Sequence, residues 1–284
     1  MANTASSMKK SDWLLPFRFR SRNIWVCLTG TVIALFGAIA GSEELSFWVG
    51  IQLLLLSYPA AFIMHAVNDL FDYEHDTVNK RDFFRERNIT PADANGVWFW
   101  TAIFSMLLLA PTILSENITG FILILLCIAL SIAYSVPPVR LKNRAVSSVI
   151  ACVVGAWSLY AICLSYTDTI TNIPRRSFLY AFFSHFVVTG GHLVDYEANM
   201  KAGQKTFVTE YGETVTVILA LISSLCLTLF GNLNGPVLLA SLTSNVLIII
   251  MIWWRNYILL GKALIITWIA TFTALLLTLG LKIV

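Results

Sequence analysis

Nine long runs of apolar residues constrain this chain most strongly, because each is about as long as a membrane-spanning helix. A helix needs about 20 predominantly apolar residues to cross a bilayer. Hydrophobic residues make up 57% of the chain and charged residues 12%, whereas soluble domains carry about 25% charged residues. We therefore predict an all-α, multi-pass membrane bundle of nine transmembrane helices, forming a single domain over residues 1–284. The runs lie at 24–41, 47–67, 97–114, 118–136, 146–166, 178–194, 214–231, 236–253 and 263–283.

The positions of lysine and arginine predict the orientation of the bundle. Short loops on the cytoplasmic side retain basic residues. Of the 19 Lys and Arg residues, all but Arg175, Arg176 and Lys282 lie in alternate loops or in the basic N-terminal segment 1–23. We expect the N-terminus in the cytoplasm and the C-terminus on the opposite side, with segment 1–23 enforcing this orientation. A net charge of only +3 argues against nucleic acid as a partner.

The first of two acidic motifs ends the second predicted span. On a continuing helix Asn68, Asp69, Asp72 and Asp76 share one face, because their spacing follows the helical repeat. Carboxylates at that spacing repel one another, so a cation must offset their charge. Mg²⁺ is commonly held by one or two carboxylates, while substrate phosphates and water complete its shell. The motif therefore predicts a magnesium site.

The second acidic motif, Gly191–Asn199, repeats the first at the end of the sixth predicted span. Asp195 aligns with Asp72, and Asn199 aligns with Asp76. Because the repeat falls at corresponding ends of two spans, we expect the two helices to face one pocket and to offer ligands from both sides.

Basic residues follow both motifs and occupy the loop between the fourth and fifth predicted spans. Arginine and lysine bind phosphate oxygens that metal ions only partly neutralise. Ionisable groups at the mouth of an apolar bundle indicate a functional site. We therefore predict that a diphosphate binds there. The candidate residues are Arg85, Arg87, Arg140, Lys142, Lys201 and Lys205.

Three windows of the sequence together resemble the UbiA superfamily of intramembrane prenyltransferases. They are Asn68-Asp69-x-x-Asp72-x-x-x-Asp76, Tyr134-Ser135-x-Pro137-Pro138-x-Arg140-x-Lys142 and Asp195-x-x-x-Asn199-x-Lys201-x-Gly203-x-x-Thr206. The resemblance implies a nine-helix bundle with cytoplasmic cap loops that binds an isoprenyl diphosphate through two Mg²⁺ ions. It also implies the chemistry: diphosphate departs to leave an allylic carbocation, which an aromatic or other lipophilic acceptor captures.

The resemblance further implies roles for single residues. Asn68, Asp72 and Asp76 would hold one metal ion, and Asp195 with Asn199 the other. Asp72, Asp76 and Asp195 would thereby be the catalytic carboxylates, and Asp69 is a further candidate ligand on the same helix face. Lys201 and Arg140 or Lys142 would contact the diphosphate, while Tyr134 and Ser135 would lie near the pocket wall.

The sequence departs from the family pattern at Asn199, where the family usually has aspartate. An asparagine carbonyl can ligate Mg²⁺, so the second metal site is weakened and not abolished. Asn199 keeps open a non-catalytic isoprenoid-binding membrane protein as an alternative. A terpene cyclase of the same superfamily, in which the substrate's own double bond captures the cation, is a second alternative. A transporter is disfavoured, because the charges lie at the ends of spans and not at the midplane.

Overall fold

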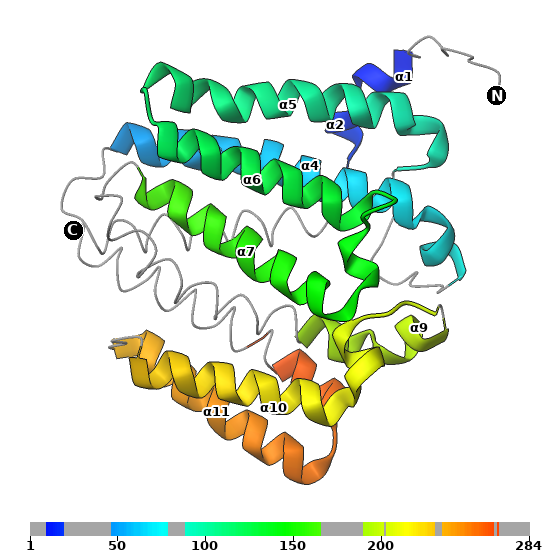
Figure 1. The fold of residues 1–284 in the computed structure, drawn as a ribbon, viewed down its shortest axis with the longest axis vertical. Coiled ribbons are helices and arrows are strands. Elements are labelled where there is room, and N and C mark those ends of the chain that lie inside the picture. The colour runs from blue at the N-terminus through cyan, green and yellow to red at the C-terminus, as the bar shows by residue number, and fades with distance from the viewer. Residues whose placement is uncertain are drawn as a thin grey trace.

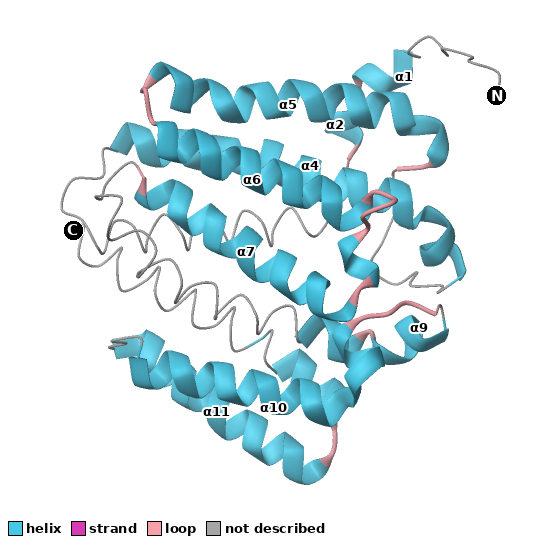
Figure 2. Cartoon of the chain, in the orientation of Figure 1, coloured by secondary structure: helices cyan, strands magenta, loops and turns pink. Residues whose placement is uncertain are grey.

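The computed structural model of the chain describes residues 10–19, 47–78, 89–165, 190–201, 203–230, 235–263 and 266. Within these ranges the secondary structure is helical and contains no β-strand, as the sequence predicts (Figure 2). The long helices are α4 (Phe47–Val78), α5 (Ala94–Leu114), α6 (Ile118–Ser135), α7 (Ala145–Leu164), α10 (Phe207–Phe230) and α11 (Gly235–Trp254). The short ones are α1 (Lys10–Trp13), α2 (Leu15–Arg18), α9 (Tyr196–Lys201) and the 3₁₀ helices η1 (Pro91–Asp93) and η2 (Leu141–Asn143).

Three of the described helices are long and apolar enough to cross a membrane, namely Pro91–Leu114, Ile118–Ser135 and Phe207–Cys226. Ala145–Gly155 and Ser241–Trp254 are shorter apolar helices. The predicted spans 24–41, 178–194 and 263–283 lie wholly or mostly outside the described residues. The helical fold is therefore confirmed for the described part of the chain, and the total of nine spans stays a prediction.

Two helices begin or end beyond the predicted spans. Helix α4 continues past residue 67 to Val78, so the first acidic motif lies on the helix itself. Helix α10 begins at Phe207, before the predicted start at 214, and is interrupted at Gly212, where φ is 84°. Glycine adopts a positive φ without the steric cost that a Cβ atom imposes. The interruption separates the first five residues of α10, 207–211, from the remainder of the helix.

Helices α4, α5, α6 and α7 alternate in direction along the chain, and α10 and α11 run opposite to each other (Figure 1). Helices α4, α5 and α6 pack against one another, α7 packs against α6, and α10, which pairs with α11, contacts α7. With this alternation, the C-terminal ends of α4 and α6, together with η2 and α9, lie at one end of the bundle, at the right in Figure 1. We call this the α9 end.

The buried apolar side chains form two clusters. The first joins α4, α5, α6 and α7, and includes the edge-to-face rings of Phe19, Phe62 and Phe104. The second joins α10 and α11 to Leu193 and Leu260. Among the described elements, the two clusters are joined mainly by the contact of α7 with α10. Each half of the described bundle therefore has its own core.

The N-terminal segment is part of the fold, beyond the role in orientation that its charge predicts. Leu15 and Phe19 are buried in the first cluster. The indole of Trp100 donates a hydrogen bond of 3.0 Å to the carbonyl oxygen of Asp12. A Cβ atom at Gly96 would lie 3.0 Å from the Cβ of Asp12, so the glycine permits this close approach. Residues 12–19 therefore cover α4 and α5.

Candidate active site

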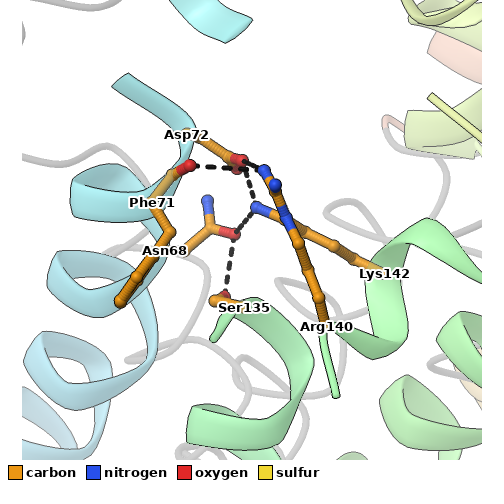
Figure 3. A network of polar contacts seen from close by, with 6 residues as sticks. All are labelled: Asn68, Phe71, Asp72, Ser135, Arg140 and Lys142. Atoms are coloured by element: carbon orange, nitrogen blue, oxygen red, sulfur yellow. Dashed lines mark hydrogen bonds and ion pairs between the residues drawn. The ribbon is translucent and has the colours of Figure 1, made fainter. Parts of the chain in front are cut away.

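Five side chains meet where α4 approaches the loop that follows α6 (Figure 3). Asn68 and Asp72 come from α4, Ser135 ends α6, and Arg140 and Lys142 lie at η2. Lys142 Nζ donates to Asp72 Oδ1 and, at 3.1 Å, to Asn68 Oδ1. Ser135 Oγ also donates to Asn68 Oδ1 at 3.1 Å. We call these five residues the α4–η2 network.

Local structure brings these side chains together. Asn68 and Asp72 are four residues apart on α4, so they lie on the same face one turn apart. Arg140 caps η2 in the left-handed conformation, with φ 33° and ψ 62°. This conformation costs a non-glycine residue about 1 kcal/mol or more. The ion pair between Arg140 Nη2 and Asp72 Oδ1, at 3.3 Å, helps to offset that cost.

The network is largely withdrawn from solvent. The Lys142 side chain is 3% exposed and that of Asp72 is 13% exposed. Burial lowers the pKa of the Lys142 ammonium, although its ion pair with Asp72 opposes the shift. Asp72 faces two cations, Lys142 and Arg140, and Asp69 also acts electrostatically on the Lys142 ammonium. The charges of the two aspartates therefore balance those of the two cations.

Arg140 retains one donor that has no acceptor. Its Nη2 group donates to the carbonyl oxygen of Phe71 and to Asp72, both at 3.3 Å. Its Nε atom is buried and makes no hydrogen bond. Leaving a buried donor unsatisfied costs roughly 1–3 kcal/mol. An anionic ligand with several oxygens would remove this cost.

The second motif runs from the helical residues 191–194 through the turn at Asp195 into α9. The backbone N–H of Asn199 donates to the carbonyl oxygen of Asp195, and that of Gln204 donates to the carbonyl oxygen of Asn199, both at 2.9 Å. The Asn199 residue is buried, whereas Lys201 and Lys205 are exposed. Helix α9 and the C-terminal end of α4 lie at the same end of the bundle (Figure 1).

The predicted metal ligands are only partly described. In the described ranges, no group of three or more His, Cys, Asp or Glu side chains is placed to hold a metal ion. However, Asn68 Oδ1 and Asp72 Oδ1 converge on one cationic atom, Lys142 Nζ. Two oxygen donors directed at one cation suit the preference of Mg²⁺ for oxygen ligands. The predicted ligand Asp76 lies on α4, but its side chain is outside the described residues.

The structure places the remaining predicted residues as follows. Asp69 lies on α4 and is partly buried. Tyr134 lies on α6, and its hydroxyl group faces Cys152 of α7. Arg85 and Arg87 lie outside the described residues. Sequence reasoning assigned Ser135 to the pocket wall but missed its hydrogen bond to Asn68, since the two residues are far apart in the chain.

The sequence profile of the UbiA prenyltransferase family matches residues 24–263. The chain belongs to this family. The matched region contains every described helix from α4 to α11, and therefore includes the whole α4–η2 network. Together with the apolar spans, membership makes this UbiA-family chain an integral membrane protein.

Two curated relatives, both named lycopene elongase/hydratase and both from Corynebacterium glutamicum, match a segment of 109 residues. They are 34% and 33% identical to this UbiA-family chain over that segment. The segment is 37% of this chain and 36% of each relative. The chain therefore matches about a third of the length of these relatives.

Solved structures with low sequence identity share the fold of this UbiA-family chain. A UbiA homologue from Archaeoglobus fulgidus, solved with DMAPP and Mg²⁺, superposes with a TM-score of 0.62 at 19% identity. That alignment covers 92% of this chain and 99% of the homologue. A digeranylgeranylglyceryl phosphate synthase structure gives a TM-score of 0.66 at 17% identity, over 94% of this chain and 97% of the synthase. The UbiA fold is therefore present over nearly the whole chain.

Proposed function

We propose that this UbiA-family protein is a Mg²⁺-dependent intramembrane prenyltransferase that transfers an isoprenyl group from an isoprenyl diphosphate to a lipophilic acceptor. The observation that carries the proposal is the α4–η2 network, in which two metal-type oxygen donors and two cations share one buried position. Family membership supports the proposal, as do the DMAPP and Mg²⁺ bound by the Archaeoglobus fulgidus homologue.

Each residue of the network has a task in the proposed reaction. Arg140 and Lys142 bind oxygens of the diphosphate, and the buried Nε of Arg140 supplies a donor that is otherwise unsatisfied. Ser135 orients Asn68 by donating to its Oδ1 atom, so that the amide oxygen faces the cation. Asp72 offers its carboxylate on the same face of α4. Buried, preorganised charges of this kind stabilise the charge that develops on a leaving group.

Magnesium would complete the site. Asn68 and Asp72, with Asp76, would hold one ion, and Asp195 with Asn199 a second. Mg²⁺ bound there neutralises charge on the departing diphosphate. We propose both that two ions bind and that the second motif holds one of them.

We also propose that the α9 end faces the cytoplasm. Arg140, Lys142 and Lys201 lie there, as the retention of basic residues on that side requires. The exposed indoles of Trp253 and Trp254 end α11 at the same end of the bundle. Tryptophan is enriched at membrane–water interfaces, so this pair supports an interface near the end of α11.

The decisive test is product analysis with the purified full-length protein. It is incubated with Mg²⁺ and farnesyl, geranylgeranyl or longer diphosphates, with and without lycopene or a hydroxylated aromatic acid as acceptor. We expect release of inorganic diphosphate and an acceptor adduct in the mass spectrum, both lost on addition of a chelator. An acceptor-free cyclic hydrocarbon or alcohol would instead indicate a cyclase. No release with any donor would indicate a binding protein.

Asn199→Asp tests the second metal position. Because the substitution adds a carboxylate to a neutral ligand position, we expect activity to be retained or raised, with half-maximal diphosphate release at a lower Mg²⁺ concentration. The matched control is Asn256→Asp, which makes the same change at an exposed helix cap, where Asn256 Oδ1 accepts from the backbone N–H of Leu259. The control should leave the Mg²⁺ requirement unchanged. Loss of activity by folded Asn199→Asp protein would contradict the assignment.

A further inference from the structure

The ammonium group of Lys142 lies where Asn68 and Asp72, two ligands of the first predicted metal site, would hold a metal ion. Its ammonium group contacts Asp72 Oδ1 and lies 3.1 Å from Asn68 Oδ1. With an exposure of only 3%, the side chain is enclosed by protein and does not extend freely into solvent. The contact is therefore a defined internal ion pair.

An ammonium group and a divalent cation cannot use these two oxygens together. Mg²⁺ requires its ligands at about 2.0–2.1 Å. An ammonium nitrogen at hydrogen-bond distance from the same two oxygens would then lie next to the ion, where the two like charges repel strongly at low dielectric. Binding of a metal ion through Asn68 and Asp72 therefore requires Lys142 to leave both oxygens.

We propose that Lys142 is a built-in competitor of the metal ion at the first site, which a divalent cation must displace from Asn68 and Asp72. Displacement leaves an ammonium group in need of an anionic partner, and a diphosphate oxygen supplies one. The competition thus couples metal binding to diphosphate binding. The metal-binding half of this inference stands on the network geometry alone, whereas the coupling rests on the proposed function.

The contacts of Arg140 differ from those of Lys142. The Nη2 group of Arg140 donates to Asp72 and to the carbonyl oxygen of Phe71 at 3.3 Å, and among the described hydrogen bonds none joins it to Asn68. Its left-handed backbone and its second acceptor hold it beside the carboxylate. Only Lys142 bridges both oxygens, so Lys142 is the group that a metal ion must replace.

The test measures binding of Mn²⁺ alone to purified full-length protein in detergent, from the electron paramagnetic resonance signal of the free ion. No isoprenyl diphosphate is present, so turnover plays no part. We expect Lys142→Met to bind Mn²⁺ at least about tenfold more tightly than the original protein, because a neighbouring positive charge is removed. Lys142→Gln should behave in the same way, and thermal unfolding shows which variant is folded. Lys142→Arg retains the charge and should bind as weakly as the original protein.

The matched control is Arg144→Met, which removes one positive charge from an exposed position in the same loop. It should change the Mn²⁺ affinity by less than about twofold, because solvent screens exposed charges. Unchanged affinity in folded Lys142→Met and Lys142→Gln proteins would overturn the inference, as would equal tightening in Arg144→Met. The test and the proposed function can fail independently. If the protein releases diphosphate but the Lys142 variants bind Mn²⁺ no more tightly, the proposed function stands and this inference fails. If the Lys142 variants bind Mn²⁺ more tightly but the protein releases no diphosphate, the inference about metal binding stands and the proposed function fails.

Discussion

Asp72→Asn is expected to lower diphosphate release by the proposed enzyme by at least roughly 10²-fold, the usual effect of deleting one preorganised electrostatic group from an active site. The substitution keeps the size of the side chain but removes the carboxylate that lies between Lys142 and Arg140. Release of inorganic diphosphate from geranylgeranyl diphosphate, measured over a range of Mg²⁺ concentrations, checks the prediction. Activity within a few-fold of the original protein would exclude Asp72 from the site.

Asp72→Asn also has a structural effect that must be separated from the catalytic one. It removes the carboxylate that contacts the buried ammonium of Lys142, and breaking such a pair costs on the order of 3 kcal/mol. The double variant Asp72→Asn, Lys142→Gln removes both charges, so its thermal unfolding midpoint should recover most of the loss. Its diphosphate release should stay low. If activity recovered together with stability, Asp72 would have only a structural role.

Gly261→Ala is expected to produce the largest loss of stability among conservative changes at the described glycines. A Cβ atom at Gly261 would lie 2.6 Å from the carbonyl oxygen of Gly190 and 3.0 Å from Cγ2 of Val194. The first of these atoms is backbone, so the two segments must move apart. Overpacking of this kind typically costs 1–3 kcal/mol. Residues 190–194 lead directly to Asp195, so diphosphate release should fall together with the unfolding midpoint.

Gly155→Ala is the matched control for Gly261→Ala. Gly155 lies within α7, and a Cβ atom there would meet no other atom within 4 Å. Alanine has a helix propensity about 1 kcal/mol better than glycine, so the control should be neutral or slightly stabilising. Unfolding midpoints measured in the same detergent compare the two variants. If both lowered the midpoint equally, the close contact between residues 190–194 and Gly261 would not be what limits stability.

The helices were the most predictable feature of the sequence. The apolar runs 97–114, 118–136, 146–166 and 236–253 agree with α5, α6, α7 and α11 within a few residues, because apolar length alone defines a span. The ends of α4 and α10 were less predictable. Both helices extend beyond the apolar run into polar sequence, where hydropathy gives no signal for a helix boundary.

Which residues of the candidate site contact one another was less predictable than which residues belong to the site. Spacing identified Asn68 and Asp72 as one face of α4, and the pattern Arg140-x-Lys142 identified two cations in one loop. That both cations bind a diphosphate stays a prediction, and the pattern did not predict that both also contact Asp72. Contacts between residues about 70 positions apart depend on tertiary packing, which periodicity does not encode. The sequence did not predict the burial of Leu15 and Phe19 either. It too depends on tertiary packing, and the charged residues around them suggest an exposed segment.

The division of the described core into two clusters has a consequence for the spacing of the two acidic motifs. The first acidic motif belongs to the α4–α7 half, and the second lies beside the α10–α11 half. Among the described elements the halves meet mainly where α7 touches α10. Each motif is therefore anchored in a core of its own, and a change in how α7 packs against α10 would alter the spacing between the two motifs.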